Sequence, residues 1–261
     1  MEREVDGMDG KVDGMEGRVC VITGTASGIG AATASAFKAA GATVAAIDVS
    51  AEATGDLVVH ADVSDEAQVE SAFAQIRERL GRIDALVNNA GIVLDRDQSV
   101  LSTDVETWQR VQDVNLRGVF LCCKHGIPHL LEGGGAVVNI ASFVALMGAA
   151  ESQISYTASK GAVLAMSREL GVEFADRGVR VNAICPGPIR TPLLDELFAT
   201  EPEKSAKRLV HIPMGRFGEP EEIAKAALFL AGDDASFITA AALTVDGGAS
   251  AAYLTPGQVV A

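Results

Sequence analysis

The stretch Val19-Cys20-Val21-Ile22-Thr23-Gly24-Thr25-Ala26-Ser27-Gly28-Ile29-Gly30 decides the fold of this chain. Its first five residues form a continuous, mostly apolar run, which is typical of a buried parallel strand. Gly24, Gly28 and Gly30 follow, and a helical run over 31–40 comes next. Glycines between a strand and a helix allow a tight turn and close approach of a pyrophosphate to the helix N-terminus. The stretch therefore predicts a dinucleotide site, although its spacing is G-x-x-x-G-x-G rather than the commoner G-x-G-x-x-G.

The same alternation continues along the rest of the chain. Apolar runs predict further strands over 42–47, 57–61, 83–87, 136–141, 179–184 and 243–248, and helical patterns lie over 65–80, 103–125, 156–177 and 220–231. Strands alternating with helices predict an α/β fold, a doubly wound parallel sheet with helices on both faces. No stretch resembles an interdomain linker, so we expect a single domain over 16–261.

A short tandem repeat over 5–18 precedes the first strand. Glycine and charged residues dominate its first copy, and such a segment has no apolar face to bury. We predict a flexible leader over 1–15 and favour it over a partner-binding arm.

Asp48 ends the second predicted strand and indicates whether the dinucleotide is NAD or NADP. A carboxylate at this point accepts hydrogen bonds from an adenosine ribose diol and repels a 2′-phosphate. No lysine or arginine occurs over 25–27 or 49–56 to neutralise that phosphate. The sequence therefore predicts NAD rather than NADP.

A second group of polar residues stands later in the chain. Ser142 follows the strand over 136–141, and Tyr156 and Lys160 are four residues apart in a helical run. That spacing puts both side chains on one helix face. An ammonium beside a phenol favours the phenolate, so we expect Lys160 to lower the pKa of Tyr156 and suit it to proton transfer.

Composition excludes several classes of protein. The chain of 261 residues is 48% hydrophobic but has no unbroken apolar run long enough to span a bilayer. A net charge of −14 disfavours nucleic acid as a partner. Residues 1–6 lack the apolar core of a secretory signal, and four cysteines without framework spacing suit a reducing compartment. We expect a cytoplasmic protein with no membrane span.

Over about 16–252 the chain resembles the short-chain dehydrogenase/reductase family. The resemblance rests on Thr23-Gly24-x-x-x-Gly28-x-Gly30, Asp62-Val63, Asn88-Asn89-Ala90-Gly91, Asn115, Ser142, Tyr156-x-x-x-Lys160 and Pro186-Gly187, which stand in the family's order and at its spacings. It implies a Rossmann-like fold with a seven-stranded sheet. It also implies hydride transfer between a nicotinamide and an alcohol or carbonyl.

The resemblance assigns a role to each of four catalytic candidates. Tyr156 would be the general acid/base, and Lys160 would lower its pKa and hold the nicotinamide ribose. Ser142 would hydrogen-bond the substrate oxygen and stabilise charge that develops there. Asn115 would anchor a water molecule that relays a proton from Lys160, although a helix asparagine on its own more commonly caps a neighbouring backbone group.

The resemblance also implies a cofactor-binding set. Asp62 and Val63 would pack against the adenine, and Ile189 and Thr191 would hold the nicotinamide carboxamide. The full set is Gly24, Ser27, Gly28, Ile29, Gly30, Asp48, Asp62, Val63, Asn89, Ala90, Gly91, Tyr156, Lys160, Pro186, Gly187, Ile189 and Thr191. The chain departs from the family at Ala240, where relatives usually have glycine after a threonine.

Apolar residues flank the catalytic candidates and suggest the substrate class. They lie over 143–147 and in a predicted substrate lid over about 190–217, with Gln153 and Glu151 as polar exceptions. The predicted substrate-binding residues are Ser142, Val144, Gln153, Tyr156, Leu193 and Leu194. Such walls favour an apolar or cyclic secondary alcohol or ketone, because buried and unpaired sugar hydroxyls would each cost about 1–3 kcal/mol. A small, more polar site that takes a polyol or sugar is the alternative.

The sequence also allows other interpretations. Within the family, a 3-oxoacyl-carrier-protein reductase is the rival enzyme, but Asp48 and the negative charge disfavour it. A dinucleotide-sensing binding protein is the rival outside catalysis. Cys122, Cys123, His125 and His129 cluster, but Pro128 interrupts their turn and no third-ligand carboxylate is placed, so we predict no metal site. The family resemblance implies that the helices carrying Asn115 and Tyr156 also form subunit contacts, and the small residues over 161–172 suit close packing, so we expect a homotetramer.

Overall fold

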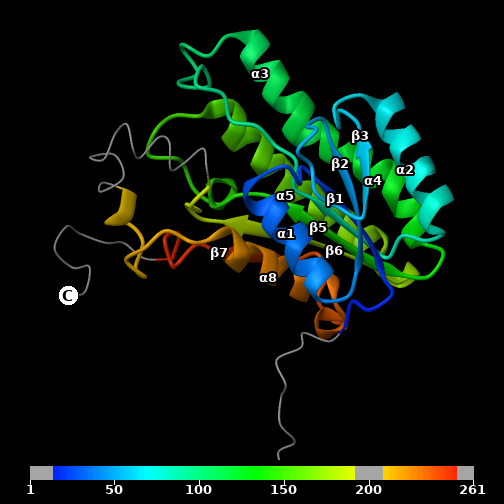
Figure 1. The fold of residues 1–261 in the computed structure, drawn as a ribbon. Helices are drawn as coiled ribbons and strands as arrows, with labels where there is room; N and C mark the ends of the chain where they lie inside the picture. Colours follow the sequence, from blue (N-terminus) through cyan, green and yellow to red (C-terminus); the bar gives the residue numbers. More distant parts are fainter. Residues whose placement is uncertain (1–13, 192–207, 252–261) are drawn as a thin grey trace, which may run out of the picture.

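The computed structural model describes residues 14–191 and 208–251. Its centre is one sheet of seven parallel strands in the order β3-β2-β1-β4-β5-β6-β7 (Figure 1). The strands are β1 Val19–Thr23, β2 Thr43–Asp48, β3 Leu57–His60, β4 Ala85–Asn88, β5 Gly135–Ile140, β6 Val179–Pro186 and β7 Ala242–Val245. Strands β1 and β4 are buried along their whole length, which explains their continuous apolar sequence.

Helices cover both faces of the sheet and enclose two apolar cores. The helices are α1 Gly28–Ala39, α2 Glu66–Leu80, α3 Val105–Gln112, α4 Gly118–Leu130, α5 Ile154–Glu173 and α8 Pro220–Ala231. Phe37 of α1 and Ile223 of α8 are buried in one core, and Phe73 of α2, Leu121 of α4 and Leu164 of α5 in the other. The predicted single-domain, doubly wound, seven-stranded fold is confirmed.

Several boundaries differ from the prediction for local physical reasons. The helix predicted over 103–125 is α3, a π-helical segment η1 over Asp113–Arg117, and α4. Pro128 was expected to interrupt the turn, but it lies inside α4, where Leu131 N still donates to Ile127 O. Strand β7 ends before the predicted position because Gly247 and Gly248 adopt φ of 64° and 87°.

The amino-terminal end of the described chain joins the core. Met15, the last residue of the predicted leader, is only 2% exposed and belongs to the core formed by α1 and α8. The first thirteen residues of that predicted leader lie outside the described residues.

The strand order reverses direction between β1 and β4. The chain runs outward from β1 to β2 and β3, and then crosses to β4, β5, β6 and β7 on the other side. In open parallel sheets, ligands bind at the carboxyl ends of the strands where such a reversal occurs. The fold therefore places the end of β1, the end of β4 and the segment after β5 along one edge.

Candidate active site

The turn from β1 to α1 has a backbone that requires glycine. Gly24 and Gly28 adopt φ of 72° and 53°, which side chains disfavour. A Cβ at Gly30 would overlap the Gly24 carbonyl oxygen. Ser27 occupies the N-cap of α1 without a side-chain hydrogen bond, and no acidic residue stands in the first turn. The turn leaves the N-terminus of α1 uncapped by a side chain, as an anion site requires.

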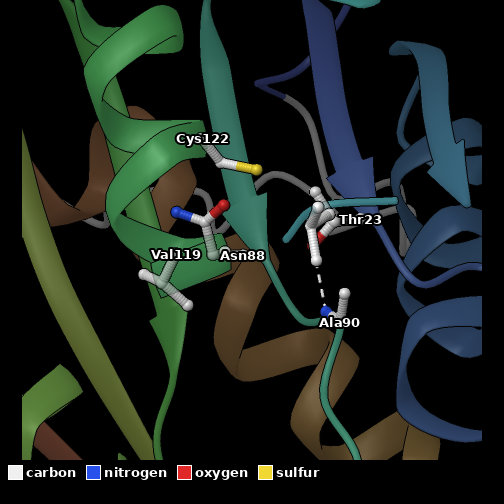
Figure 2. A pocket seen from close by; sticks show the side chains of 7 residues that line it. Thr23, Asn88, Ala90, Val119 and Cys122 are labelled. Carbon is white, nitrogen blue, oxygen red and sulfur yellow. Dashed lines mark hydrogen bonds between the residues drawn. The ribbon is translucent and has the colours of Figure 1, made fainter. Parts of the chain in front are cut away.

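The end of β4 supports this turn directly. Figure 2 shows Ala90 N donating to Thr23 Oγ1, at 3.0 Å, and Asn89 N donates to the same oxygen at 3.0 Å. The Asn89 Nδ2 donates to the carbonyl oxygens of Thr23 and Gly24, at 3.0 and 2.9 Å. Asn89 was expected to line the adenosine side, but its amide nitrogen is bound to the backbone of the turn.

The gap drawn in Figure 2 is a packing defect rather than a ligand pocket. It lies between β1, β4 and α4, and it is too small to hold a water molecule. The residues that line it are Thr23, Val63, Asn88, Ala90, Gly118, Val119 and Cys122. Val63 is buried here against Gly118, where a Cβ would come within 2.8 Å of Val63 Cγ2.

Asp48 lies at the carboxyl end of β2, next to the glycine turn. Its Oδ2 accepts from Ala26 N at 3.0 Å, and its Oδ1 accepts from Ser50 N at 2.9 Å. The residue is 9% exposed. The carboxylate thus faces the turn and also holds it in shape, a second role that the sequence did not indicate.

Asp62 ends the segment after β3 and is held by its neighbours. Its Oδ1 accepts from Ser64 N and Ser64 Oγ, and Arg110 Nη2 lies 3.6 Å from Oδ2. Burial raises the pKa of Asp62, but the Ser64 hydrogen bonds and the Arg110 charge outweigh it and keep that pKa below its usual value.

Ser142, Tyr156 and Lys160 meet at the carboxyl end of β5. The Ser142 side chain lies close enough to the Tyr156 hydroxyl to lower the pKa of that phenol. Lys160 Nζ donates to Ile140 O at 2.7 Å and lies 5.6 Å from the centroid of the Tyr156 ring. The structure therefore brings together the three side chains that the sequence singled out.

Burial controls the protonation of this group. It raises the pKa of Tyr156 above its ordinary value, while the Ser142 hydrogen bond acts in the opposite direction. Burial also lowers the pKa of Lys160 to about 8. The sequence led us to expect that Lys160 lowers the pKa of Tyr156. That expectation is wrong, because desolvation is the larger effect and raises the pKa of Tyr156.

Asn115 lies in the π-helical segment η1 and is fully buried. Its Oδ1 accepts from Ile92 N at 2.7 Å, and its Nδ2 donates to Ile92 O at 2.9 Å. Its side-chain amide therefore holds a backbone segment, which is the plainer of the two roles considered from the sequence. A Cβ at Gly91 would lie 3.3 Å from Asn115 Oδ1 and 3.5 Å from Lys160 Nζ, so Gly91 lets these groups approach each other. Single π-turns inside α-helices are frequent at functional sites.

The end of β6 closes the site from the other side. Gly187 packs against β7, where a Cβ would come within 2.7 Å of Asp246. Ile189 is 8% exposed and forms a bridge with Gly218. Thr191 reaches back toward the glycine turn, since its Cγ2 would be 3.3 Å from a Cβ on Gly28. Residues 186–191 and the β1–α1 turn therefore face one another.

The structure describes only part of the apolar segments predicted to contact the substrate. Val144 is 3% exposed, so its side chain packs in the protein. Leu146 and Met147 are each 44% exposed and supply apolar surface beside it. Gln153 occupies the N-cap of α5 with its side chain uncommitted to the helix. Leu193, Leu194 and most of the predicted lid lie outside the described residues.

The cysteines and histidines for which we predict no metal site pack against other parts of the protein. Cys122 and Cys123 are buried, and burial raises the pKa of both thiols. His129 stacks on Phe73, and His125 Nε2 lies 3.4 Å from Glu66. Within residues 14–191 and 208–251 there is no group of three or more side chains suited to hold a metal ion. No helix in that part of the chain is long and apolar enough to cross a membrane.

No sequence pattern indicates the role of one residue near the catalytic group, Asp97. Asp97 accepts hydrogen bonds from the backbone N–H groups of Ser155 and Tyr156. It lies 58 residues before Ser155, in a loop whose fold no local pattern predicts.

With this geometry established, the class of protein follows from comparison with known families. A family model described as enoyl-(acyl carrier protein) reductase matches residues 24–250. The chain belongs to the short-chain dehydrogenase/reductase family of oxidoreductases, whose cofactor is a nicotinamide dinucleotide.

Particular relatives cover nearly the whole chain. A 2-(R)-hydroxypropyl-CoM dehydrogenase of Xanthobacter autotrophicus is 43% identical over 87% of this chain and 96% of its own. The 3-oxoacyl-[acyl-carrier-protein] reductase FabG of Thermotoga maritima is 41% identical over 88% and 96%. Levodione reductase, a solved structure, superposes with a TM-score of 0.85 at 39% identity, covering 92% of this chain and 100% of that chain.

Proposed function

We propose that this protein is an NAD(H)-dependent dehydrogenase that interconverts a secondary alcohol and a ketone, with an apolar or cyclic substrate. The observation that carries the proposal is the convergence of Ser142, Tyr156 and Lys160 at the end of β5, beside an uncapped glycine turn. The relatives support the reaction class, since the name of one of them specifies a 2-hydroxypropyl group.

The residues of the β1–β4 edge fit a dinucleotide. Gly24, Gly28 and Gly30 allow the tight shape of the turn, because a Cβ at each position would meet neighbouring protein atoms. The free N-terminus of α1 favours the negative charge of a pyrophosphate. Asp48 supports NAD over NADP, because a 2′-phosphate at this carboxylate would be repelled. The remaining proposed contacts are Ser27, Ile29, Asp62, Val63, Asn89, Ala90, Gly91, Pro186, Gly187, Ile189 and Thr191.

When bound, the nicotinamide supplies the hydride donor or acceptor. The chain's own residues handle the proton and the substrate oxygen. Tyr156 exchanges the proton with that oxygen, and Ser142 Oγ donates a hydrogen bond to it. Lys160, whose pKa burial lowers to about 8, exchanges its own proton near the working pH and holds the ribose hydroxyls. Asn115 holds the segment after Gly91 and, in this proposal, also positions the relay water.

The substrate class is inferred from the surface around this group. The exposed faces of Leu146 and Met147 favour an apolar ring or chain over a polyol. Glu151, a charged group that could attract a polar substrate, forms an ion pair with Arg208 at 2.8 Å. Substrate contacts are proposed for Ser142, Val144, Gln153, Tyr156, Leu193 and Leu194.

The test is a panel of substrates assayed with NAD and NADP in parallel by the absorbance of the reduced nicotinamide. We expect the highest kcat/KM for cyclic or aryl secondary alcohols with NAD. A clear preference for polyols would contradict the substrate assignment. A preference for NADPH with a 3-oxoacyl-carrier-protein substrate would favour the reductase resembling FabG. A protein that binds the dinucleotide without any turnover would be a sensor instead.

The setting of the enzyme is also part of the proposal. Four free, buried cysteines support a reducing compartment, the cytoplasm. Apolar side chains on the outer faces of the helices, Trp108, Phe120 and Val172, are 37%, 50% and 73% exposed and support a homotetramer. A mass near 27.0 kDa in dilute solution would contradict that assembly.

A further inference from the structure

Helix α5 carries Tyr156 and Lys160, yet it has no capping side chain of its own. Gln153, at its N-cap, makes no side-chain hydrogen bond to the helix, and the first turn contains no acidic residue. By contrast, α2 and α3 are capped locally by Asp65 and Asp104. The first N–H groups of a helix need acceptors when they are buried. Helix α5 must therefore obtain its acceptors from another part of the chain.

Asp97 provides them from the loop over 92–103. Its Oδ1 accepts from Ser155 N and its Oδ2 from Tyr156 N, both at 2.8 Å. Asp97 is only 5% exposed, and its charge faces the positive end of the helix dipole. Both oxygens of a buried carboxylate are thus bound to the backbone of Tyr156 and of the residue before it.

The loop that carries Asp97 is itself held in place. Asp97 N donates to Leu94 O at 2.9 Å, and Gln98 O accepts from Ile154 N at 3.2 Å. Gln112, at the end of α3, donates through Nε2 to Ser155 O at 2.9 Å. The first turn of α5 is therefore attached on two sides to elements that precede it in the chain.

We propose that Asp97 is a positioning residue for the dehydrogenase reaction, one that fixes the backbone of Tyr156 and so sets its phenol against Ser142 and Lys160. This rests on the proposed role of Tyr156. The contacts of the Asp97 carboxylate are to backbone N–H groups, so it acts through Tyr156 and not on the reacting atoms. A misplacement of about 1 Å in a catalytic group can cost about 100-fold in rate.

The first experiment compares Asp97→Asn with Asp104→Asn. Each variant replaces one carboxylate that caps a helix, but only Asp97 caps the helix of Tyr156. Asparagine at 97 keeps one acceptor and presents an N–H group to a backbone N–H. We expect kcat to fall about 10- to 100-fold in Asp97→Asn, with Kd for NADH, from calorimetry, within about 2-fold of wild type. Asp104→Asn should keep the wild-type kcat.

The second measurement follows the ionisation of Tyr156 without cofactor or substrate. The chain has only two tyrosines, so in a Tyr253→Phe background the near-ultraviolet absorbance of tyrosinate reports Tyr156 alone. Wild type should titrate above the ordinary tyrosine value, because burial raises the pKa of Tyr156. Asp97→Asn should shift the titration toward about 10, since a loosened and less negative site exposes the phenol. Asp104→Asn should leave it in place.

An unchanged kcat and an unchanged titration in Asp97→Asn would overturn the proposal. If that variant does not fold, as judged by circular dichroism, Asp97→Ser replaces it. Serine removes the charge and retains one acceptor, so wild-type kcat in Asp97→Ser would overturn the proposal equally. An active Tyr156→Phe enzyme would overturn the proposed function itself. If Tyr156→Phe is inactive and Asp97→Asn is fully active, the proposed role of Asp97 is wrong, but the proposed function stands.

Discussion

At the end of β1 the glycines of the turn, Gly24, Gly28 and Gly30, come from one continuous strand–turn–helix stretch. Asn89 and Asp48 add hydrogen bonds to that turn from other strands. At the end of β5 the corresponding groups come from distant parts of the chain. Ser142 follows one strand, Tyr156 and Lys160 lie on a later helix, and Asp97 and Asn115 precede both. The glycine turn is encoded mainly by local sequence, whereas the catalytic edge is assembled by tertiary contacts.

Because of this difference, we expect substitutions at the two edges to affect different steps. A change in the glycine turn acts on the backbone that touches the dinucleotide, so binding should report it. A change at the catalytic edge passes through hydrogen bonds to backbone groups, such as those from Asn115 to Ile92. Turnover should then respond more than binding. Four variants test this separation of the two edges.

The largest effect is expected for Tyr156→Phe. It removes the proton donor and acceptor but keeps the ring, so kcat should fall by about 10²- to 10⁴-fold. Kd for NADH should stay near the wild-type value, because the nucleotide edge is intact. Steady-state kinetics and calorimetry on one preparation measure both quantities. If NADH binding is lost together with turnover, the two edges are not separable.

Gly30→Ala should give the reverse pattern. The added Cβ would overlap the Gly24 carbonyl oxygen, and the turn must shift to accommodate it. Such overpacking costs about 1–3 kcal/mol, so we expect Kd for NADH to rise by about 10-fold or more and Tm to fall. Gly133→Ala is the control, since a Cβ there meets nothing within 4 Å. Unchanged NADH binding in Gly30→Ala would mean that the glycine turn is not part of the cofactor site.

How far the sequence predicts each edge follows from the same difference. The strands, the glycine turn and the cluster of Ser142, Tyr156 and Lys160 are visible in the sequence because periodicity and spacing act over short distances. The π-helical segment around Asn115 and the cap provided by Asp97 are not. Each depends on which element packs beside it, and the pKa of Tyr156 likewise depends on burial that spacing does not reveal.

The cofactor preference rests on Asp48, whose carboxylate has two tasks. Because it also accepts from Ala26 N and Ser50 N, its removal should loosen the turn as well as the ribose contact. We expect the double variant Asp48→Ser, Val49→Arg to shift the ratio of kcat/KM for NAD over NADP by about 10- to 100-fold toward NADP. Val49 is 71% exposed, so an arginine there fits without displacing the core. Val49→Arg alone, which keeps the carboxylate, should shift the ratio less. An equal shift in this control would mean that Asp48 does not select the cofactor.

The smallest expected effect is a pH-dependent gain in stability from Lys160→Met. Burial lowers the pKa of Lys160 from 10.5 to about 8, so the unfolded chain binds the proton more tightly than the folded protein. The charged lysine therefore destabilises the folded state below about pH 8, and this penalty fades as pH rises from about 8 toward the unfolded value. This lowering of the Lys160 pKa corresponds to at most about 3 kcal/mol of unfolding free energy. In the variant, part of that gain is offset by the lost hydrogen bond to Ile140 O.

Chemical denaturation of the protein without cofactor should find the variant more stable than wild type at pH 7, and the two closer in stability at pH 10. The cysteines of the unfolded chain ionise in the same pH range, but they are common to both proteins and cancel in the difference. A difference that stays constant from pH 7 to pH 10 would mean that Lys160 is not held at a lowered pKa by the catalytic edge.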